Sequence, residues 1–222
     1  MANKEKTSSK VKAHQRYRLA DGTIVPGVTT ITGMLHKPAL VPWANRLGLQ
    51  GIDVRNYVDE KARAGSLAHE MILAYFKGEE ADTSAYNQIE IELAENAFLS
   101  FLEWEKGKKL EVIAAEKQLV SEEHKYGGTF DLLARIDGKT TLVDFKTGSG
   151  IYPEYWLQVA GYGQLIRENE LSEPAFYIII NIPRTEDENF LDPKRSAVWI
   201  ADKAWPVFFH LLRVYYGMKE IK

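Results

Sequence analysis

The sequence contains no cysteine among its 222 residues. This absence excludes disulfide bonds, thiol nucleophiles, cysteine-ligated zinc sites and iron–sulfur clusters. A long apolar run is also missing: the longest, residues 175–182, is interrupted by Asn181 and is far shorter than the roughly 20 residues that a membrane-spanning helix needs. Residues 1–25 are polar and lysine-rich and contain no apolar segment typical of a secretion signal. We therefore expect a cytoplasmic protein without a membrane partner.

The chain also lacks an excess of positive charge. Its 28 Lys and Arg residues stand against 31 Asp and Glu residues, which gives a formal net charge of −3, so a nucleic-acid partner would have to be held by a local patch. One basic segment lies at the N-terminus, and its charged residues are Lys4, Glu5, Lys6, Lys10, Lys12, Arg16 and Arg18. A solvated tail and a phosphate-binding segment both fit this composition. We expect a flexible basic tail over residues 1–16 and a single domain over residues 17–222.

The spacing of apolar residues changes along the chain from a helical period to a period of two and back. It predicts helices over 53–76 and 84–106, the first ending at Gly78 and the second beginning near a capping Ser84. Downstream we expect strands over 110–120, 126–136 and 139–147, a helix over 153–169, strands over 175–182 and 196–200, and a last helix that carries Trp205 and Tyr216. The expected core is an α-β-β-β-α-β arrangement of the α/β class.

The second and third expected strands form a hairpin around a two-residue Asp-Gly turn at 137–138. Pairing outward from this turn places Asp131 directly opposite Asp144. Lys146 lies two residues beyond Asp144 and therefore on the same face of the strand. The hairpin is thus predicted to bring two carboxylates and one lysine together.

Like charges directly opposite each other in an antiparallel pair are destabilising, so the two aspartates need an offsetting interaction. Three are open: protonation of one carboxylate, solvation of both on the wet face of an edge hairpin, or a divalent cation between them. Oxygen ligands of this kind suit Mg²⁺ or Mn²⁺ and phosphoryl chemistry, in which a neighbouring lysine stabilises developing charge. Glu116, in the middle of the preceding strand, is interpreted equally well as a further ligand or as a surface acid.

Four short segments of the chain stand out in order. They are GSLAHE at residues 65–70, GTFD at 128–131, DFKTG at 144–148 and QVAGY at 158–162. Together they resemble the motifs of the PD-(D/E)XK nuclease superfamily, and within it the RecB-like exonuclease group. Each motif alone is weak, but four in order with compatible local structure are specific. The resemblance implies a restriction-endonuclease-like fold, with a mixed sheet flanked by helices.

The resemblance also implies roles for individual residues. Asp131 and Asp144 would bind the metal, with the backbone carbonyl of Phe145 as a further oxygen ligand. Lys146 would be the catalytic lysine. His69 would be an additional metal ligand that approaches from the helix, although without the family a structural histidine would be the favoured interpretation.

Two further residues of the last motif gain a role from the family. Gln158 and Tyr162 are four residues apart and share one helical face. The resemblance places them near the site and the DNA strand. From the residues alone we would place Tyr162 in the core and Gln158 on the surface.

We therefore predict a Mg²⁺- or Mn²⁺-dependent deoxyribonuclease that acts from DNA ends in recombination, repair or DNA processing. Arg55, Lys61 and Arg63 are predicted phosphate contacts. DNA is the expected partner, with a recombination or replication protein as a further one. Two alternatives stay open: a structure-specific endonuclease, and a non-catalytic DNA-binding accessory protein on the same fold. The complete aspartate–lysine set argues against the second.

Overall fold

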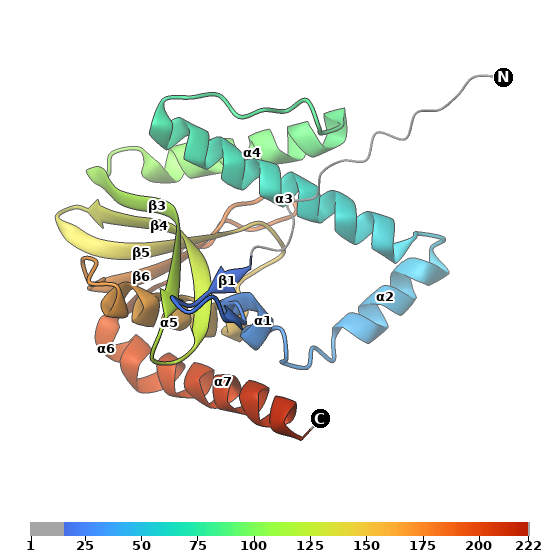
Figure 1. Cartoon of the computed structure of the whole chain (residues 1–222). Helices are drawn as coiled ribbons and strands as arrows, with labels where there is room; N and C mark the ends of the chain where they lie inside the picture. The colour runs from blue at the N-terminus through green and yellow to red at the C-terminus, as the bar shows by residue number, and fades with distance from the viewer. Residues whose placement is uncertain (1–15, 222) are drawn as a thin grey trace.

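A mixed five-stranded sheet lies at the centre of the protein in a computed structural model that describes residues 16–221 (Figure 1). Across the sheet the strands are β3 (Leu110–Ser121), β4 (Tyr126–Ile136), β5 (Lys139–Lys146), β6 (Phe176–Asn181) and β7 (Lys194–Ser196). Strands β5 and β6 run parallel, and the other neighbours are antiparallel. The basic tail expected over residues 1–16 lies outside the described residues, apart from Arg16.

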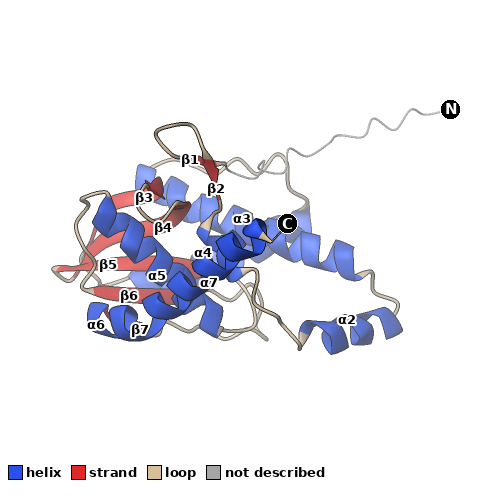
Figure 2. Cartoon of the chain, turned by 60° about the horizontal axis from the view of Figure 1, so that its bottom comes forward, coloured by secondary structure: helices blue, strands red, loops and turns tan. Residues whose placement is uncertain are grey.

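Helices cover both faces of this sheet (Figures 1 and 2). Helices α3 (Val54–Lys77) and α4 (Gln88–Glu105) pack on one face, and α1 (Val28–Thr32), α5 (Pro153–Glu168) and α7 (Trp205–Glu220) pack on the other. The remaining elements are β1 (Tyr17–Arg18), β2 (Ile24–Val25), α2 (Leu40–Leu49), α6 (Ala197–Trp199) and the π-helical turn η1 (Ile200–Ala204). Within the described part of the chain, no helix combines the length and the apolar character needed to cross a membrane.

The two faces of the central hairpin pack against different helices. Val143 and Phe145 belong to the core cluster beneath α3 and α4. Leu133 and Leu142 belong to the cluster beneath α5 and α7 and are fully buried. An edge hairpin with a wet face, one of the three interpretations of the paired aspartates, is therefore wrong, because both strands of the hairpin lie inside the sheet. The predicted α-β-β-β-α-β order and fold class are confirmed.

Helix α4 begins later than expected. Its cap is Asn87 rather than Ser84: the Asn87 side chain accepts a hydrogen bond from the Glu90 N–H, and the Glu90 carboxylate accepts one from the Asn87 N–H, each 2.9 Å long. This reciprocal cap satisfies two N–H groups of the first turn at once. The predicted end of the preceding helix is confirmed, since Gly78 has a φ of 70° and closes α3.

The strand expected over 196–200 is wrong. Strand β7 ends at Ser196, which pairs with Phe176, the first residue of β6. The Ala197 N–H still donates to the Ala175 carbonyl at 3.0 Å, but Ser196 caps α6, because its hydroxyl accepts a hydrogen bond from the Trp199 N–H. The chain therefore turns into α6 and η1, which carry it to the face covered by α7.

Candidate active site

The hairpin of β4 and β5 follows the predicted register as it approaches the site. Asp137 and Gly138 have φ values of 48° and 78°, as a two-residue turn with left-handed backbone at both positions requires. The ladder then runs from this turn to the pair Leu132–Val143. The register is thus confirmed over the whole paired part of the hairpin.

Beyond that last pair the ladder opens around Asp131. The Phe145 N–H donates to Asp131 Oδ2 at 2.8 Å, in place of a backbone carbonyl. On the other side of β4, Glu116 occupies the position opposite Asp131 and has a φ of 45°, a conformation uncommon for a residue with a side chain. Asp131 therefore lies where regular pairing is interrupted towards both neighbouring strands, and its carboxylate is available for contacts outside the sheet.

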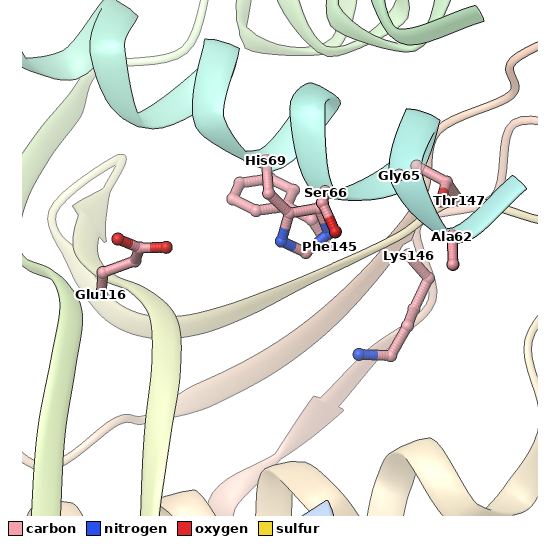
Figure 3. A pocket seen from close by; sticks show the side chains of 8 residues that line it. All are labelled: Ala62, Gly65, Ser66, His69, Glu116, Phe145, Lys146 and Thr147. Atoms are coloured by element: carbon pink, nitrogen blue, oxygen red, sulfur yellow. The ribbon is translucent and has the colours of Figure 1, made fainter. Parts of the chain in front are cut away.

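Helix α3 passes over this opening and forms one wall of a pocket of about 320 Å³ (Figure 3). His69 points from α3 towards the sheet, Glu116 enters from β3, and Lys146 enters from β5. A side chain at Gly65 would place its Cβ 2.5 Å from Thr147 Oγ1. The glycine that opens the GSLAHE segment is therefore required for α3 to approach β5 closely enough to bring His69 to the strands.

His69 and Asp131 form the first charged pair of the pocket, with 3.7 Å between Nδ1 and Oδ1. Burial alone would lower the pKa of His69, but the Asp131 carboxylate outweighs it and raises that pKa. Burial alone would raise the pKa of Asp131, yet His69, Lys146 and the Phe145 N–H hold it below its ordinary value. Asp131 is therefore an ionised carboxylate held among positive groups and donors.

The pKa of Asp144 is shifted in the opposite direction from that of Asp131. Its side chain is 1% exposed, Lys146 Nζ forms an ion pair with Oδ2, and Oδ1 accepts no hydrogen bond within the described part of the chain. Burial raises the pKa of Asp144 to about 6, and the charge of Asp131 contributes in the same direction against the lowering effect of Lys146. Burial and the charge of Asp131 thus disfavour the ionised form of Asp144, and the ion pair with Lys146 opposes them.

Lys146 has a second neighbour that sequence reasoning missed. Its Nζ lies 5.0 Å from the ring centroid of Tyr155 on α5, a cation–π arrangement. Tyr155, Gln158 and Tyr162 are spaced three and four residues apart and so face the same side of α5. That spacing was the signal in the sequence that could have identified Tyr155.

The donor set of the pocket fits a hard divalent cation. His69 and Glu116 line the pocket. Asp131, which contacts His69, and Asp144, which is ion-paired to Lys146, supply carboxylate oxygens, one of which is buried without a hydrogen-bond partner among the described residues. Oxygen-rich ligation with one imidazole is typical of Mg²⁺ and Mn²⁺ sites rather than of soft metals.

The chain also matches the sequence profile of a known family. The profile of the PD-(D/E)XK nuclease superfamily matches residues 44–205. The chain belongs to this superfamily. The matched range contains all four segments picked out from the sequence and every element from α3 to the sheet and α5. No curated protein sequence gives a significant match.

A comparison with solved structures finds matches of low sequence identity. One is a provisionally named exonuclease from Eubacterium rectale, 15% identical, with a TM-score of 0.45, covering 69% of this chain and 68% of that one. Another is LHK-Exo, solved in complex with dAMP, 13% identical, with a TM-score of 0.33, covering 69% of this chain and 83% of that one.

In this PD-(D/E)XK protein, Gln158 and Tyr162 form a linked pair beside the carboxylates. Gln158 Nε2 donates to the Tyr162 hydroxyl at 2.9 Å. Tyr162 is buried, and burial together with the nearby charges of Asp144 and Asp131 raises its pKa well above its ordinary value. Its ring packs on Gly128, where a Cβ would lie 2.7 Å from Cε1. Tyr162 therefore connects the G-x-x-D segment to α5 as a neutral phenol.

The three basic residues predicted to contact phosphates have different surroundings. Arg55 is exposed on the first turn of α3, and Lys61 is partly exposed. Arg63 Nε instead donates to Glu90 Oε1 at 2.5 Å and its Nη2 to Glu90 Oε2 at 3.1 Å. The guanidinium of Arg63 is held by α4, which leaves Arg55 and Lys61 as the candidate phosphate contacts.

A second group of potential ligands lies elsewhere, at the turn between β3 and β4. Ligand atoms of Glu123, His124 and Glu168 come within 4.8 Å of one another. His124 Nδ1 is hydrogen-bonded to Glu168 Oε1 at 2.8 Å, and its ring lies edge-on to Trp205 and Phe209. This histidine ties the turn to α5 and α7.

Proposed function

We propose that the protein hydrolyses phosphodiester bonds of DNA with Mg²⁺ or Mn²⁺ and acts from DNA ends. The observation that carries the proposal is Asp144: a buried carboxylate that is ion-paired to Lys146, a residue of the pocket lining, and that has one oxygen without a hydrogen-bond partner among the described residues. A fold gains no stability from such a group, because a buried acceptor without a donor is costly. Its placement is explained by a cation that it binds.

The ligands of that cation would be Asp131, Asp144, the backbone carbonyl of Phe145, His69 and Glu116. The Phe145 N–H and His69 both contact Asp131, so the carboxylate is already oriented. When bound, the cation neutralises charge on the scissile phosphate and lowers the pKa of a water molecule.

The residues of the chain position the other reacting groups. Lys146 can donate a hydrogen bond to the attacking water or to the phosphate oxygens as their charge develops, and the Tyr155 ring limits the directions that its ammonium can take. Water adds its oxygen to the phosphorus and the bond from phosphorus to one sugar oxygen breaks. That oxygen takes up a proton, so that one product ends in a phosphate and the other in a hydroxyl.

One argument supports DNA as the substrate, and a separate argument supports action from its ends. Arg55 and Lys61 place positive charge on the helix that leads into the pocket, where they can contact phosphates. Action from ends follows from the likeness of the four motifs to the RecB-like exonuclease group. Roles in repair or recombination, and a protein partner there, stay predictions.

The test uses end-labelled linear DNA, single- and double-stranded, together with a closed circle, in Mg²⁺, Mn²⁺ or EDTA. We expect linear DNA to be degraded in either metal and circles to be spared. Cleavage of closed circles at the rate of linear DNA would favour the endonuclease alternative. DNA binding without cleavage in any metal would favour the accessory protein.

The assignment to this pocket needs variants of its residues. Lys146→Ala and Asp131→Asn should lose most of the activity while melting as folded proteins. Lys139→Ala, at the exposed far end of the same strand, is the matched control and should cleave as the unaltered protein does. Full activity of Lys146→Ala would place the chemistry elsewhere.

A further inference from the structure

Lys146 contacts two groups of different kinds, a carboxylate and an aromatic ring. The side chain extends from β5 into the pocket (Figure 3). Its ammonium forms an ion pair with Asp144 Oδ2 and lies 5.0 Å from the ring centroid of Tyr155. Because only 17% of the Lys146 side chain is exposed, bulk water can hydrate its charge only in part. If the ion pair were broken, the ring would still stabilise that charge.

The ion pair of Lys146 and a divalent cation make competing demands on Asp144. Asp131 and Asp144 together carry two negative charges when both are ionised, and a divalent cation carries two positive charges. With such a cation bound, the two carboxylates are neutralised, and Asp144 no longer attracts the ammonium of Lys146. The ammonium then needs a second position inside the pocket.

The ring of Tyr155 is held firmly enough to provide that position. Tyr155 lies in the first turn of α5 and packs against the core cluster beneath α5 and α7. The Tyr152 ring meets it edge to face, with 5.6 Å between ring centroids, and the Tyr152 hydroxyl is hydrogen-bonded to Ser149 Oγ at 2.9 Å. The ring is therefore fixed by the helix, by the core and by the short loop that follows Lys146.

A buried asparagine fixes the start of the same loop. Asn181 on β6 pairs with Lys146 in the sheet and is fully buried. Its Nδ2 donates to the carbonyl oxygens of Gly148 at 2.9 Å and Asn189 at 2.8 Å. The backbone on either side of the loop is thus anchored, so that the distance between Lys146 and Tyr155 is set by the fold.

We propose that Tyr155 is a positioning residue, whose ring holds the ammonium of Lys146 in the pocket when a divalent cation binds Asp144. Lys146 then leaves Asp144, and it becomes free to donate to the attacking water or to the phosphate only once the cation is bound. This inference rests on the proposed function for the cation and for the role of Lys146. It adds the residue that couples the position of the lysine to the cation.

The first experiment measures the affinity for Mn²⁺ by calorimetry, without DNA. Tyr155→Leu removes the ring and should weaken Mn²⁺ binding by at least about two-fold, the factor that corresponds to the lower range of a cation–π contact. Tyr155→Phe retains a ring and should bind Mn²⁺ as the unaltered protein does. In a protein that already carries Lys146→Met, Tyr155→Leu should leave the affinity unchanged, because no ammonium remains to be displaced.

The second experiment observes Lys146 directly, by NMR of protein made with isotope-labelled lysine. The signal of its ε-methylene group is identified as the one that Lys146→Met lacks. Adding Mg²⁺ should shift this proton signal upfield, because the end of the side chain moves closer to the face of the Tyr155 ring. Tyr155→Phe should show the same shift, and Tyr155→Leu should not. A signal that does not respond to saturating Mg²⁺ in the unaltered protein would show that the ion pair with Asp144 persists, and would overturn the proposal.

Trp156→Leu is the matched control for the loss of a ring from α5. Trp156 is the next residue of the helix and is partly exposed like Tyr155, but the cation near its ring is Arg195, at 5.2 Å. This variant should bind Mn²⁺ as the unaltered protein does. An equal loss of affinity in Trp156→Leu and Tyr155→Leu would indicate a general effect on α5 and would overturn the proposal. So would a loss in Tyr155→Leu that persists together with Lys146→Met.

The outcome is distinguishable from that of the proposed function. In cleavage assays, Tyr155→Leu should lower kcat while leaving KM for DNA close to that of the unaltered protein, and Tyr155→Phe should restore kcat. Dependence of Mn²⁺ binding on both Tyr155 and Lys146, without cleavage of any DNA, would support the positioning role and refute the nuclease activity. Cleavage by Tyr155→Leu at the unaltered kcat, with unchanged affinity for Mn²⁺, would refute the positioning role alone.

Discussion

Two buried acids of this protein, Glu90 and Asp144, have opposite surroundings. Glu90 is 3% exposed and Asp144 is 1% exposed. Glu90 accepts hydrogen bonds from the Arg63 guanidinium and from the Asn87 N–H. Burial would raise the pKa of Glu90, but these donors hold it below its ordinary value. Asp144 has an ion pair with Lys146, faces the charge of Asp131, and keeps Oδ1 without a partner among the described residues.

The two acids differ in how fully their carboxylates are hydrogen-bonded. Glu90 joins α3 to α4 and closes the first turn of α4, so its hydrogen bonds contribute to stability. Asp144 has a raised pKa and one oxygen without a partner among the described residues, which reduces stability. Burial alone therefore does not distinguish the two acids, whereas the hydrogen-bond donors around each carboxylate do.

The largest expected difference between the two acids concerns activity. Asp144→Asn should lower the rate of DNA cleavage by about 10²-fold or more, the scale for loss of one group that stabilises transition-state charge. Glu90→Gln should cleave at close to the rate of the unaltered protein once rates are corrected for the folded fraction. Rates on end-labelled DNA in Mg²⁺ measure both, and equal losses in the two variants would contradict the distinction.

The second-largest expected difference between the two acids concerns stabilisation by metal. A cation that binds the folded state at 100 times its Kd stabilises that state by about 2.7 kcal/mol. We expect Mg²⁺ or Mn²⁺ to raise the melting temperature of the unaltered protein and of Glu90→Gln, and to leave that of Asp144→Asn nearly unchanged. Thermal melts in EDTA and over a metal titration test this, and an equal rise in all three proteins would show binding elsewhere, for example at Glu123 and Glu168.

Without metal, we expect the substitution of Glu90 to cost more stability than the substitution of Asp144. Glu90→Gln breaks a charged pair and should lower the free energy of unfolding by about 1–3 kcal/mol, the cost of leaving buried donors unsatisfied. Asp144→Asn removes one of two like charges at nearly constant volume and should be as stable as the unaltered protein or slightly more so. Denaturant unfolding in EDTA gives both values.

The smallest expected effect is a dependence on pH. The pKa of Asp144 is raised to about 6 from an ordinary 3.8, so its ionisation costs stability above pH 6, and that cost decreases as the pH falls from 6 towards 3.8. Glu90 acts in reverse, because its pKa is lowered and its contribution is lost only as the pH falls through that lowered value. Going from pH 8 to pH 5 in EDTA, the unaltered protein should gain about 1 kcal/mol relative to Asp144→Asn. A constant difference between the two proteins would contradict the raised pKa.

The local parts of the fold were predictable because they depend on near neighbours in the sequence. The Asp-Gly turn and the alternation around it set the hairpin register, which holds up to the pair Leu132–Val143. Gly78 ends α3 because only a residue without a side chain adopts its left-handed backbone without cost. The strand expected over 196–200 was wrong because Ser196 caps α6, accepting a hydrogen bond from the Trp199 N–H, and the chain is helical from Ala197.

Much of the environment of the site could not be predicted. The motif residues were found by their resemblance to a family, but the availability of the Asp131 carboxylate depends on the Phe145 N–H and on the position of Glu116 in a neighbouring strand. The cation–π contact of Lys146 comes from Tyr155 on a helix that follows the hairpin. Arg63 was expected on DNA, yet its partner Glu90 lies 27 residues further along the chain.

The sequence by itself determined which residue types are present, the order of the elements and the register that carries Asp131 and Asp144 to the same end of one hairpin. The tertiary structure alone decided which charges have partners: Glu90 meets Arg63 because α3 packs on α4, and Asp144 keeps one oxygen without a partner among the described residues because the sheet is covered on both faces. The physical reason is that periodicity and turn chemistry act over a few residues, whereas desolvation and charge pairing depend on segments that meet only when the chain has folded.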